Sequence, residues 1–179
     1  LVSTSPLSRG VVNRFVAGTT TADVVATVQN LHDLGLLATV DRLGEDTLDR
    51  AAADTTVADY KDVLRALSGA GLSDSAEVSV KLSAVGQALG DSGESIALEN
   101  ALEICSIAKQ VGTTVTFDME DHTTIDSTLR ILTEVRKEFP TTGGVLQAHL
   151  LRTEDDVAAY SYNDSRIRLC KGAYAEAAD

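Results

Sequence analysis

Apolar residues along the chain alternate between a helical and a strand pattern. Val24, Val28 and Leu31 lie at helical spacing within residues 21–34, and Gly35 ends that pattern before the apolar run 36–40. The same order of a helix followed by a strand returns four more times. We therefore expect five strands, at residues 36–40, 77–83, 113–119, 145–150 and 165–171.

Residues that end or begin helices mark the boundaries between these segments. Gly69 and Gly112 follow two of the helical patterns, and Pro140 follows a third. Thr153 precedes a short helical pattern that runs through about Tyr160, so we expect its hydroxyl to cap that helix.

Strands that alternate with helices every 30 residues or so are typical of a parallel sheet with right-handed crossovers. A complete (β/α)₈ TIM barrel needs about 250 residues, so these 179 residues would form about five of its eight β/α units. An open, doubly wound sheet of five strands fits the length better, but its Gly-rich phosphate turn is missing after the first two strands. We expect an α/β fold of the distorted barrel type, with a helical segment at 1–34 and a partial barrel at 35–179.

The composition narrows the class of protein. With 44% hydrophobic residues, 13 Gly and only 2 Pro, the chain is typical of a globular domain. Its formal charge of −12 repels phosphate backbones and anionic lipids, so nucleic acid is excluded as an expected partner. Two cysteines in apolar stretches indicate a reduced, cytoplasmic chain.

Polar side chains recur on one face of the predicted strands, near their carboxyl ends. The residues that share a face are Ser79 and Lys81; Thr116, Asp118 and Glu120; Val145, Gln147 and His149; and Arg168, Cys170 and Gly172. Buried charges need partners or a ligand, and parallel α/β folds keep their chemistry at the carboxyl rim. We therefore predict that Lys81, Asp118, Gln147 and Arg168 converge there.

Simpler interpretations of these residues stay open. Lys81 and Asp118 could form a structural ion pair. Asp118, Glu120 and His122 lie at alternate positions, so on one face of a strand they could bind a hard metal ion. Cys170 is better suited to fill apolar space than to act as a nucleophile, because no His is near it in the sequence.

Several of these segments match one known family in order and spacing. The chain resembles the proline dehydrogenase family, in its monofunctional bacterial form, from about residue 11 to residue 174. The segments that carry the resemblance are DRLGE at 41–45, VSVKLS at 78–83, FDME at 117–120, LQA at 146–148 and RLCKGAY at 168–174.

The resemblance implies a flavoenzyme on a distorted barrel, which oxidises L-proline to Δ1-pyrroline-5-carboxylate. A hydride would pass to FAD and the electrons later to a quinone. The location implied is cytoplasmic, with peripheral contact between the full-length protein and the inner membrane face.

The resemblance also assigns roles by position. Lys81 would bind the proline carboxylate, Gln147 would bond the pyrimidine edge of the flavin, and Arg168 would lie beside its reactive nitrogen. Lys81, Asp118 and Arg168 would be the catalytic residues, and no metal is implied. Glu45 would be a gate carboxylate. The residues implied around the cofactor, besides Gln147 and Arg168, are Asp118, Met119, Cys170, Gly172, Ala173 and Tyr174.

The last three strands of the family, its Thr and Lys at the FAD phosphates and its two carboxylate-binding arginines have no counterpart here. We therefore expect exposed edges on the first and fifth strands, and a homo-oligomer formed through them. Two other hypotheses stay open. One is a Schiff-base lyase of the aldolase type that uses Lys81, and the other is a structural fragment without a ligand.

Overall fold

The centre of the fold is a parallel sheet of five strands, in a computed structural model that describes residues 16–162 and 164–174. The strands are β1 (Ala38–Asp41), β2 (Ala76–Val80), β3 (Val115–Phe117), β4 (Gly143–Gln147) and β5 (Ile167–Cys170). Their order in the sheet is β1-β2-β3-β4-β5, the same as in the sequence. A doubly wound sheet reverses its strand order at a switch point, so that alternative is wrong and the partial barrel is confirmed.

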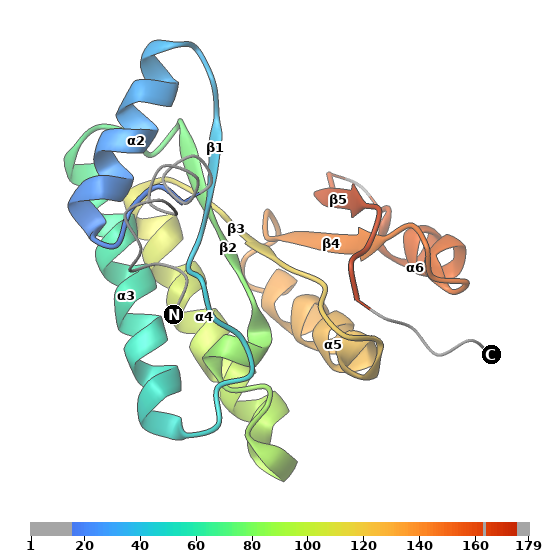
Figure 1. Ribbon diagram of the computed structural model, residues 1–179. Helices are drawn as coiled ribbons and strands as arrows, with labels where there is room; N and C mark the ends of the chain where they lie inside the picture. Colours follow the sequence, from blue (N-terminus) through green and yellow to red (C-terminus); the bar gives the residue numbers. More distant parts are fainter. Residues whose placement is uncertain (1–15, 163, 175–179) are drawn as a thin grey trace, which may run out of the picture.

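Helices lie along the outside of the curled sheet (Figure 1). They are α2 (Thr21–Asp33), α3 (Arg50–Gly69), α4 (Gly93–Val111), α5 (Ile125–Arg136) and α6 (Thr153–Tyr160). Three short 3₁₀ helices, η1 (Leu82–Val85), η2 (Gly90–Ser92) and η3 (His122–Thr124), follow β2 or β3. The predicted helical segment 1–34 is described only from residue 16 onward, and there α2 packs against α3 and β1.

The hydrophobic core lies between the sheet and these outer helices. Val78, Val80 and Phe117 point outward from the sheet, and each is at most 1% exposed. They pack in one cluster with Leu64 of α3 and Ile104 of α4. Because side chains alternate along a strand, the residues between them face the inside of the curl.

The strands are shorter than the apolar runs predicted. β4 begins at Gly143 and ends at Gln147, which leaves His149 in a turn. A Cβ atom at Gly143 would lie 2.5 Å from Thr116 Oγ1, so the absent side chain is what lets β4 approach β3 this closely. Glycine is a poor indicator of strands in sequence, and the predicted boundary was therefore wrong.

The predicted cap of the last helix was also wrong. The N-cap of α6 is Arg152, and Thr153 is the first helical residue. The Thr153 hydroxyl instead donates to the Gln147 carbonyl oxygen at 2.5 Å. It thereby ties the start of α6 to the end of β4.

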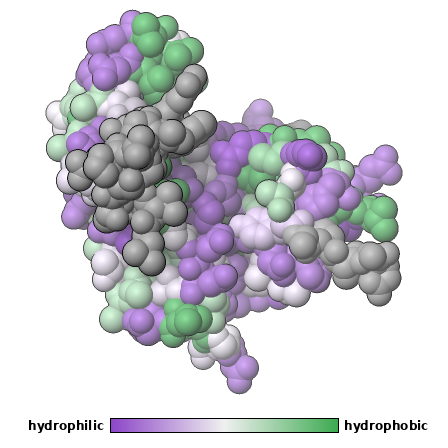
Figure 2. Space-filling model, viewed as in Figure 1, coloured by the Kyte–Doolittle hydropathy of each residue, from purple (hydrophilic) through white to green (hydrophobic). Residues whose placement is uncertain are grey.

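One patch of apolar surface lies at a corner of the molecule. Figure 2 shows it over the turn between α2 and β1, at the top of the view. The exposed leucines of this turn are Leu34, Leu36 and Leu37. None of the helices in the described ranges has both the length and the apolar character needed to cross a membrane.

Candidate active site

Four side chains meet on the inner face of the sheet at the carboxyl ends of β2, β3 and β5. Ser79 Oγ donates to Asp118 Oδ1 at 2.7 Å, and Arg168 Nη2 donates to the same oxygen and, at 3.1 Å, to Ser79 Oγ. Lys81 Nζ lies 3.5 Å from Asp118 Oδ2. The structure thus brings Lys81, Asp118 and Arg168 together as expected.

Asp41 is a member of this cluster that the sequence reasoning missed as a site residue. Its Oδ2 accepts a hydrogen bond from Lys81 Nζ at 2.7 Å, shorter than the contact between Lys81 and Asp118. Asp41 ends β1 and stands in register with Ser79 of β2. Asp41 and Thr39 are two residues apart on β1, so both point to the inner face of the sheet. This alternation along β1 is the sequence signal that could have identified Asp41.

The two carboxylates control the charge of Lys81. Burial favours the neutral amine, but the hydrogen bond to Asp41 and the charges of Asp41 and Asp118 raise the pKa of Lys81 above its usual value. An ammonium group has three N–H donors, and these two partners leave one for an anionic ligand. Lys81 is therefore suited to bind a carboxylate and poorly suited to attack a carbonyl.

Gln147 lies at the same end of the sheet, at the end of β4, but faces other partners. Its Nε2 donates to the carbonyl oxygens of Met119 at 3.0 Å and Glu120 at 2.9 Å. Its Oε1 is buried and has no hydrogen-bond partner among the described residues. A buried acceptor without a donor is costly, so this oxygen is a candidate to accept a hydrogen bond from a ligand N–H.

Gly172 packs closely against His149 and against this amide. Its φ of 104° is in the left-handed region, and a Cβ atom there would lie 1.9 Å from His149 Nδ1 and 3.1 Å from Gln147 Oε1. Main-chain bonds from Ala148 N to the Cys170 carbonyl at 2.7 Å and from His149 N to the Lys171 carbonyl at 3.2 Å continue the pairing past β4. Cys170 is half-buried and has a free thiol.

The ends of β1 and β5 are joined through two other predicted site residues. The Tyr174 hydroxyl donates to Glu45 Oε2 at 3.0 Å, which connects the segment after β5 to the loop after β1. Burial and this hydrogen bond to a carboxylate raise the pKa of Tyr174. Ala173, between Gly172 and Tyr174, is exposed.

Asp118 and Glu120 both lie beyond the end of β3 and bind different partners. β3 ends at Phe117, so the alternation stops, and Glu120 accepts from Ser83 N at 3.1 Å and Ser83 Oγ at 2.6 Å. Burial raises the pKa of Glu120. Within the described ranges, no three His, Cys, Asp or Glu side chains are grouped so that they could hold a metal ion.

Ser83 is a second residue that the sequence reasoning missed. Its hydroxyl accepts from Asp46 N at 3.0 Å and its carbonyl accepts from Thr47 N at 3.2 Å. Ser83 thus holds the loop that carries Glu45 against the end of β2. No sequence pattern indicated this contact, because both partners lie outside regular strands.

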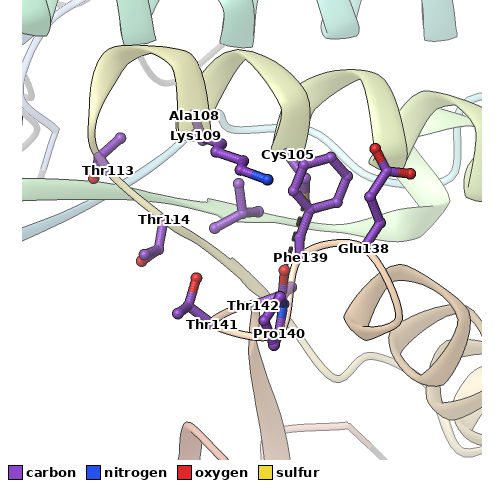
Figure 3. Close-up of a pocket in the computed structure, with 11 residues that line it drawn as sticks. Cys105, Ala108, Lys109, Thr113, Thr114, Glu138, Phe139, Pro140, Thr141 and Thr142 are labelled. Carbon is purple, nitrogen blue, oxygen red and sulfur yellow. Dashed lines mark hydrogen bonds between the residues drawn. The ribbon is translucent and has the colours of Figure 1, made fainter.

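A cavity of about 300 Å³ lies at the opposite, amino-terminal end of the strands (Figure 3). Its walls include Thr113 and Thr114 before β3, Thr142 before β4 and Cys105 of α4. Burial raises the pKa of the Cys105 thiol to about 12, which makes it unreactive. The residues predicted for the site lie at the other end of the sheet, and the cavity does not involve them.

Comparison with known sequences gives a consistent result. A family model described as proline dehydrogenase matches residues 24–178. Proline dehydrogenase 1 of Bacillus subtilis is 38% identical over 165 residues, which are 92% of this chain and 53% of the relative. Proline dehydrogenase of Deinococcus radiodurans is 39% identical over 168 residues, with the same two coverages. The chain spans about half the length of these curated relatives.

Solved structures show the same architecture. Proline utilization A (PutA) from Bdellovibrio bacteriovorus, inactivated by N-propargylglycine, aligns with a TM-score of 0.81 over 92% of this chain and 20% of its own, at 24% identity. A mutant of Proline Utilization A from Bradyrhizobium japonicum aligns with a TM-score of 0.65 over 88% of this chain and 18% of its own, at 22% identity. At these identities the likeness establishes the barrel-type fold.

Proposed function

The chain belongs to the proline dehydrogenase family, and from this premise we propose that it supplies the first five strands of a flavin-dependent catalytic barrel that oxidises L-proline. The product would be Δ1-pyrroline-5-carboxylate. The observation that carries the proposal is the cluster of Lys81, Asp118 and Arg168 on the inner face of the sheet, beside the unpartnered Gln147 amide oxygen.

The residues present fit a flavin. The buried Gln147 Oε1 suits a ring N–H, because it accepts no hydrogen bond from the described residues. Arg168 is 39% exposed, so its guanidinium keeps surface for a ligand while it binds Asp118. We propose that four further residues line the cofactor. Met119 follows β3, Cys170 ends β5, and Ala173 and Tyr174 follow β5.

Oxidation of proline to an imine removes two electrons and two protons, as a hydride from carbon and a proton from nitrogen. When bound, the flavin would supply the hydride acceptor. Lys81 would bind the proline carboxylate with its remaining N–H and so orient the ring for transfer. Arg168 would place a positive charge where negative charge develops, and Asp118 and Ser79 hold that charge in position.

We further propose FAD as the flavin and a quinone as the electron acceptor, with the protein in the cytoplasm and in peripheral contact with the inner membrane face. The family membership supports these statements. We also propose that the edges of β1 and β5 pair with other strands, either of the same chain or of a second copy, because bare edges favour association.

The test is anaerobic mixing of the flavin-loaded protein, made from its complete reading frame, with L-proline. We expect the visible flavin absorbance to bleach, and we expect Lys81→Met to raise the KM for proline about a hundredfold. Lys61→Met is the matched control, because Lys61 pairs with Glu103 on the outer helices. A protein that binds flavin but shows no bleaching with proline would contradict the proposal.

The alternative hypothesis, a Schiff-base lyase, predicts a covalent adduct on Lys81. Borohydride would trap a carbonyl substrate on Lys81 if its amine were the nucleophile. The raised pKa of Lys81 keeps the nitrogen protonated at neutral pH, so we expect no trapped adduct.

A further inference from the structure

A second group of charged and hydroxyl side chains lies on the inner face of the sheet, below the candidate active site. This lower layer consists of Thr39, Glu77, Thr114, Thr116 and Arg166. Glu77 precedes Ser79 by two residues, and Arg166 precedes Arg168 by two residues. Because side chains alternate along a strand, residues two apart point to the same face. The lower layer therefore lies two residues before the candidate active site on the same strands.

Arg166 and Glu77 form the central pair of the lower layer. Arg166 Nη2 donates to Glu77 Oε2 at 2.6 Å, and Nη1 donates to Thr114 Oγ1 and, at 3.2 Å, to the Thr141 carbonyl oxygen. Thr114 and Thr116 each donate to Glu77 at 3.1 Å. Burial favours the neutral carboxyl, but Arg166 and the two hydroxyls lower the pKa of Glu77, so the pair is ionised at neutral pH.

The Arg166 side chain reaches past two strands to do this. Arg166 directly precedes β5, whereas Glu77 is on β2, and β3 and β4 lie between them in the sheet. On β4 the inward position is Gly143, where a Cβ atom would lie 2.5 Å from Thr116 Oγ1. The Thr116 side chain fills the space that a Cβ atom at position 143 would need, so Thr116 packs directly against the β4 backbone at this level.

The main chain of Arg166 is held from the outer side as well. Its carbonyl oxygen accepts from Arg136 Nη2 at 2.9 Å and from Gly144 N at 3.0 Å. Arg136 is only 6% exposed, and its Nε also donates to the Thr142 carbonyl oxygen at 2.9 Å. The start of β5 is therefore fixed to β4 by its backbone and to β2 by its side chain.

We propose that Glu77 and Arg166 are positioning residues that set where the Arg168 guanidinium lies in the active site. The inference rests on the proposed function. The backbone of β5 pairs with β4, and the side-chain bond from Arg166 to Glu77 adds a second restraint that reaches β2 across the inner face. Two residues span about 7 Å of strand, so movement at Arg166 is carried directly to Arg168.

The experiment compares Glu77→Gln, Arg166→Met and Arg166→Lys in the flavin-loaded protein. We expect the first two to lower kcat about tenfold, to change the KM for proline less than about twofold and to shift the flavin potential to more negative values. Arg166→Lys keeps the charge and should recover at least half of the lost kcat. Glu94→Gln and Arg130→Met are matched controls, because this Glu and Arg form a bidentate pair on the outer helices and should change neither quantity.

Two results in both Glu77→Gln and Arg166→Met would together overturn the inference. They are a kcat within about twofold of that of the unmodified protein and a flavin potential equal to it within error. Hydrogen exchange over residues 166–170 separates it from the proposed function, because exchange requires neither flavin nor proline. If the unmodified protein does not respond to proline, the proposed function fails. Faster exchange in Arg166→Met but not in Arg130→Met would then still support the positioning role, and equal exchange would overturn it.

Discussion

Arg168 and Asp118 show how single residues combine two requirements at the site. The Arg168 guanidinium is fixed by Asp118 and Ser79, yet 39% of its side chain is exposed. A fixed charge stabilises developing negative charge without the cost of reorienting water or protein groups. The exposed fraction provides the surface on which a ligand can make contact.

Changing Arg168 to Met should therefore affect redox chemistry more than substrate binding. We expect a more negative flavin potential and reduction by proline about a hundredfold slower, because one preorganised cation is lost. Anaerobic stopped-flow and a potential titration would measure both quantities. Arg168→Lys is the control that keeps the charge, and an unchanged potential and rate in Arg168→Met would contradict the assigned role.

The ion pair of Glu77 should make stability depend on pH in a definite direction. Its folded pKa is lower than the reference value of 4.5, so its contribution is present above that value and is lost as pH falls through the folded pKa. We expect Glu77→Gln to reduce the free energy of unfolding by about 1–2 kcal/mol at neutral pH. In urea denaturation, this difference between the two proteins should shrink below pH 4.5. A difference that stays constant with pH would show that the charge of Glu77 does not contribute.

Among the elements, the junction of β3 with β4 depends on an absent side chain. Gly143 of β4 pairs with Thr116 of β3, and the two backbones approach closely because position 143 has no Cβ atom. The lower layer and the active site both extend across this junction. Its geometry therefore affects both layers.

Gly143→Ala should destabilise the fold by about 1–3 kcal/mol, because the new methyl group would overlap the Thr116 side chain. Gly69→Ala is the matched control. Gly69 ends α3, and a Cβ atom there meets nothing within 4 Å. We expect that variant to be neutral or slightly stabilised, and equal denaturation midpoints for the two variants would contradict the argument.

For the whole molecule, the sheet does not close among the described residues. Its order begins at β1 and ends at β5, and Tyr174 to Glu45 is a side-chain contact between those two ends. A site on the inner face of such a sheet is open to water along one side. Water weakens the electrostatic contacts that orient a charged substrate.

The 179-residue chain by itself should therefore oxidise proline at less than about one hundredth of the rate of a complete family member. Proline-dependent dye reduction would measure this, with Bacillus subtilis Proline dehydrogenase 1 assayed beside it as the positive control. Turnover by the purified chain that approached the rate of that relative would contradict the expectation.

Much of the fold and part of the site could be predicted from residue patterns. Periodicity and helix-ending glycines indicated the five strands, and strand parity brought Lys81 and Arg168 to one inner face. Parity did not predict where β3 ends, since the strand stops at Phe117 and both Asp118 and Glu120 lie beyond it. It also did not single out Asp41, since a short strand of four residues carries little pattern.

The sequence by itself determined the number of strands, the polar inner face and the family, because these depend on local periodicity and on motifs. The tertiary structure decided the order of the strands in the sheet, which excluded the doubly wound alternative. Only the tertiary structure decided which charges pair. Glu77 meets Arg166 and Ser79 meets Arg168, each 89 residues apart in the chain, across intervening strands. Such partners depend on the curvature of the sheet, which is not encoded in the spacing of residues along one strand.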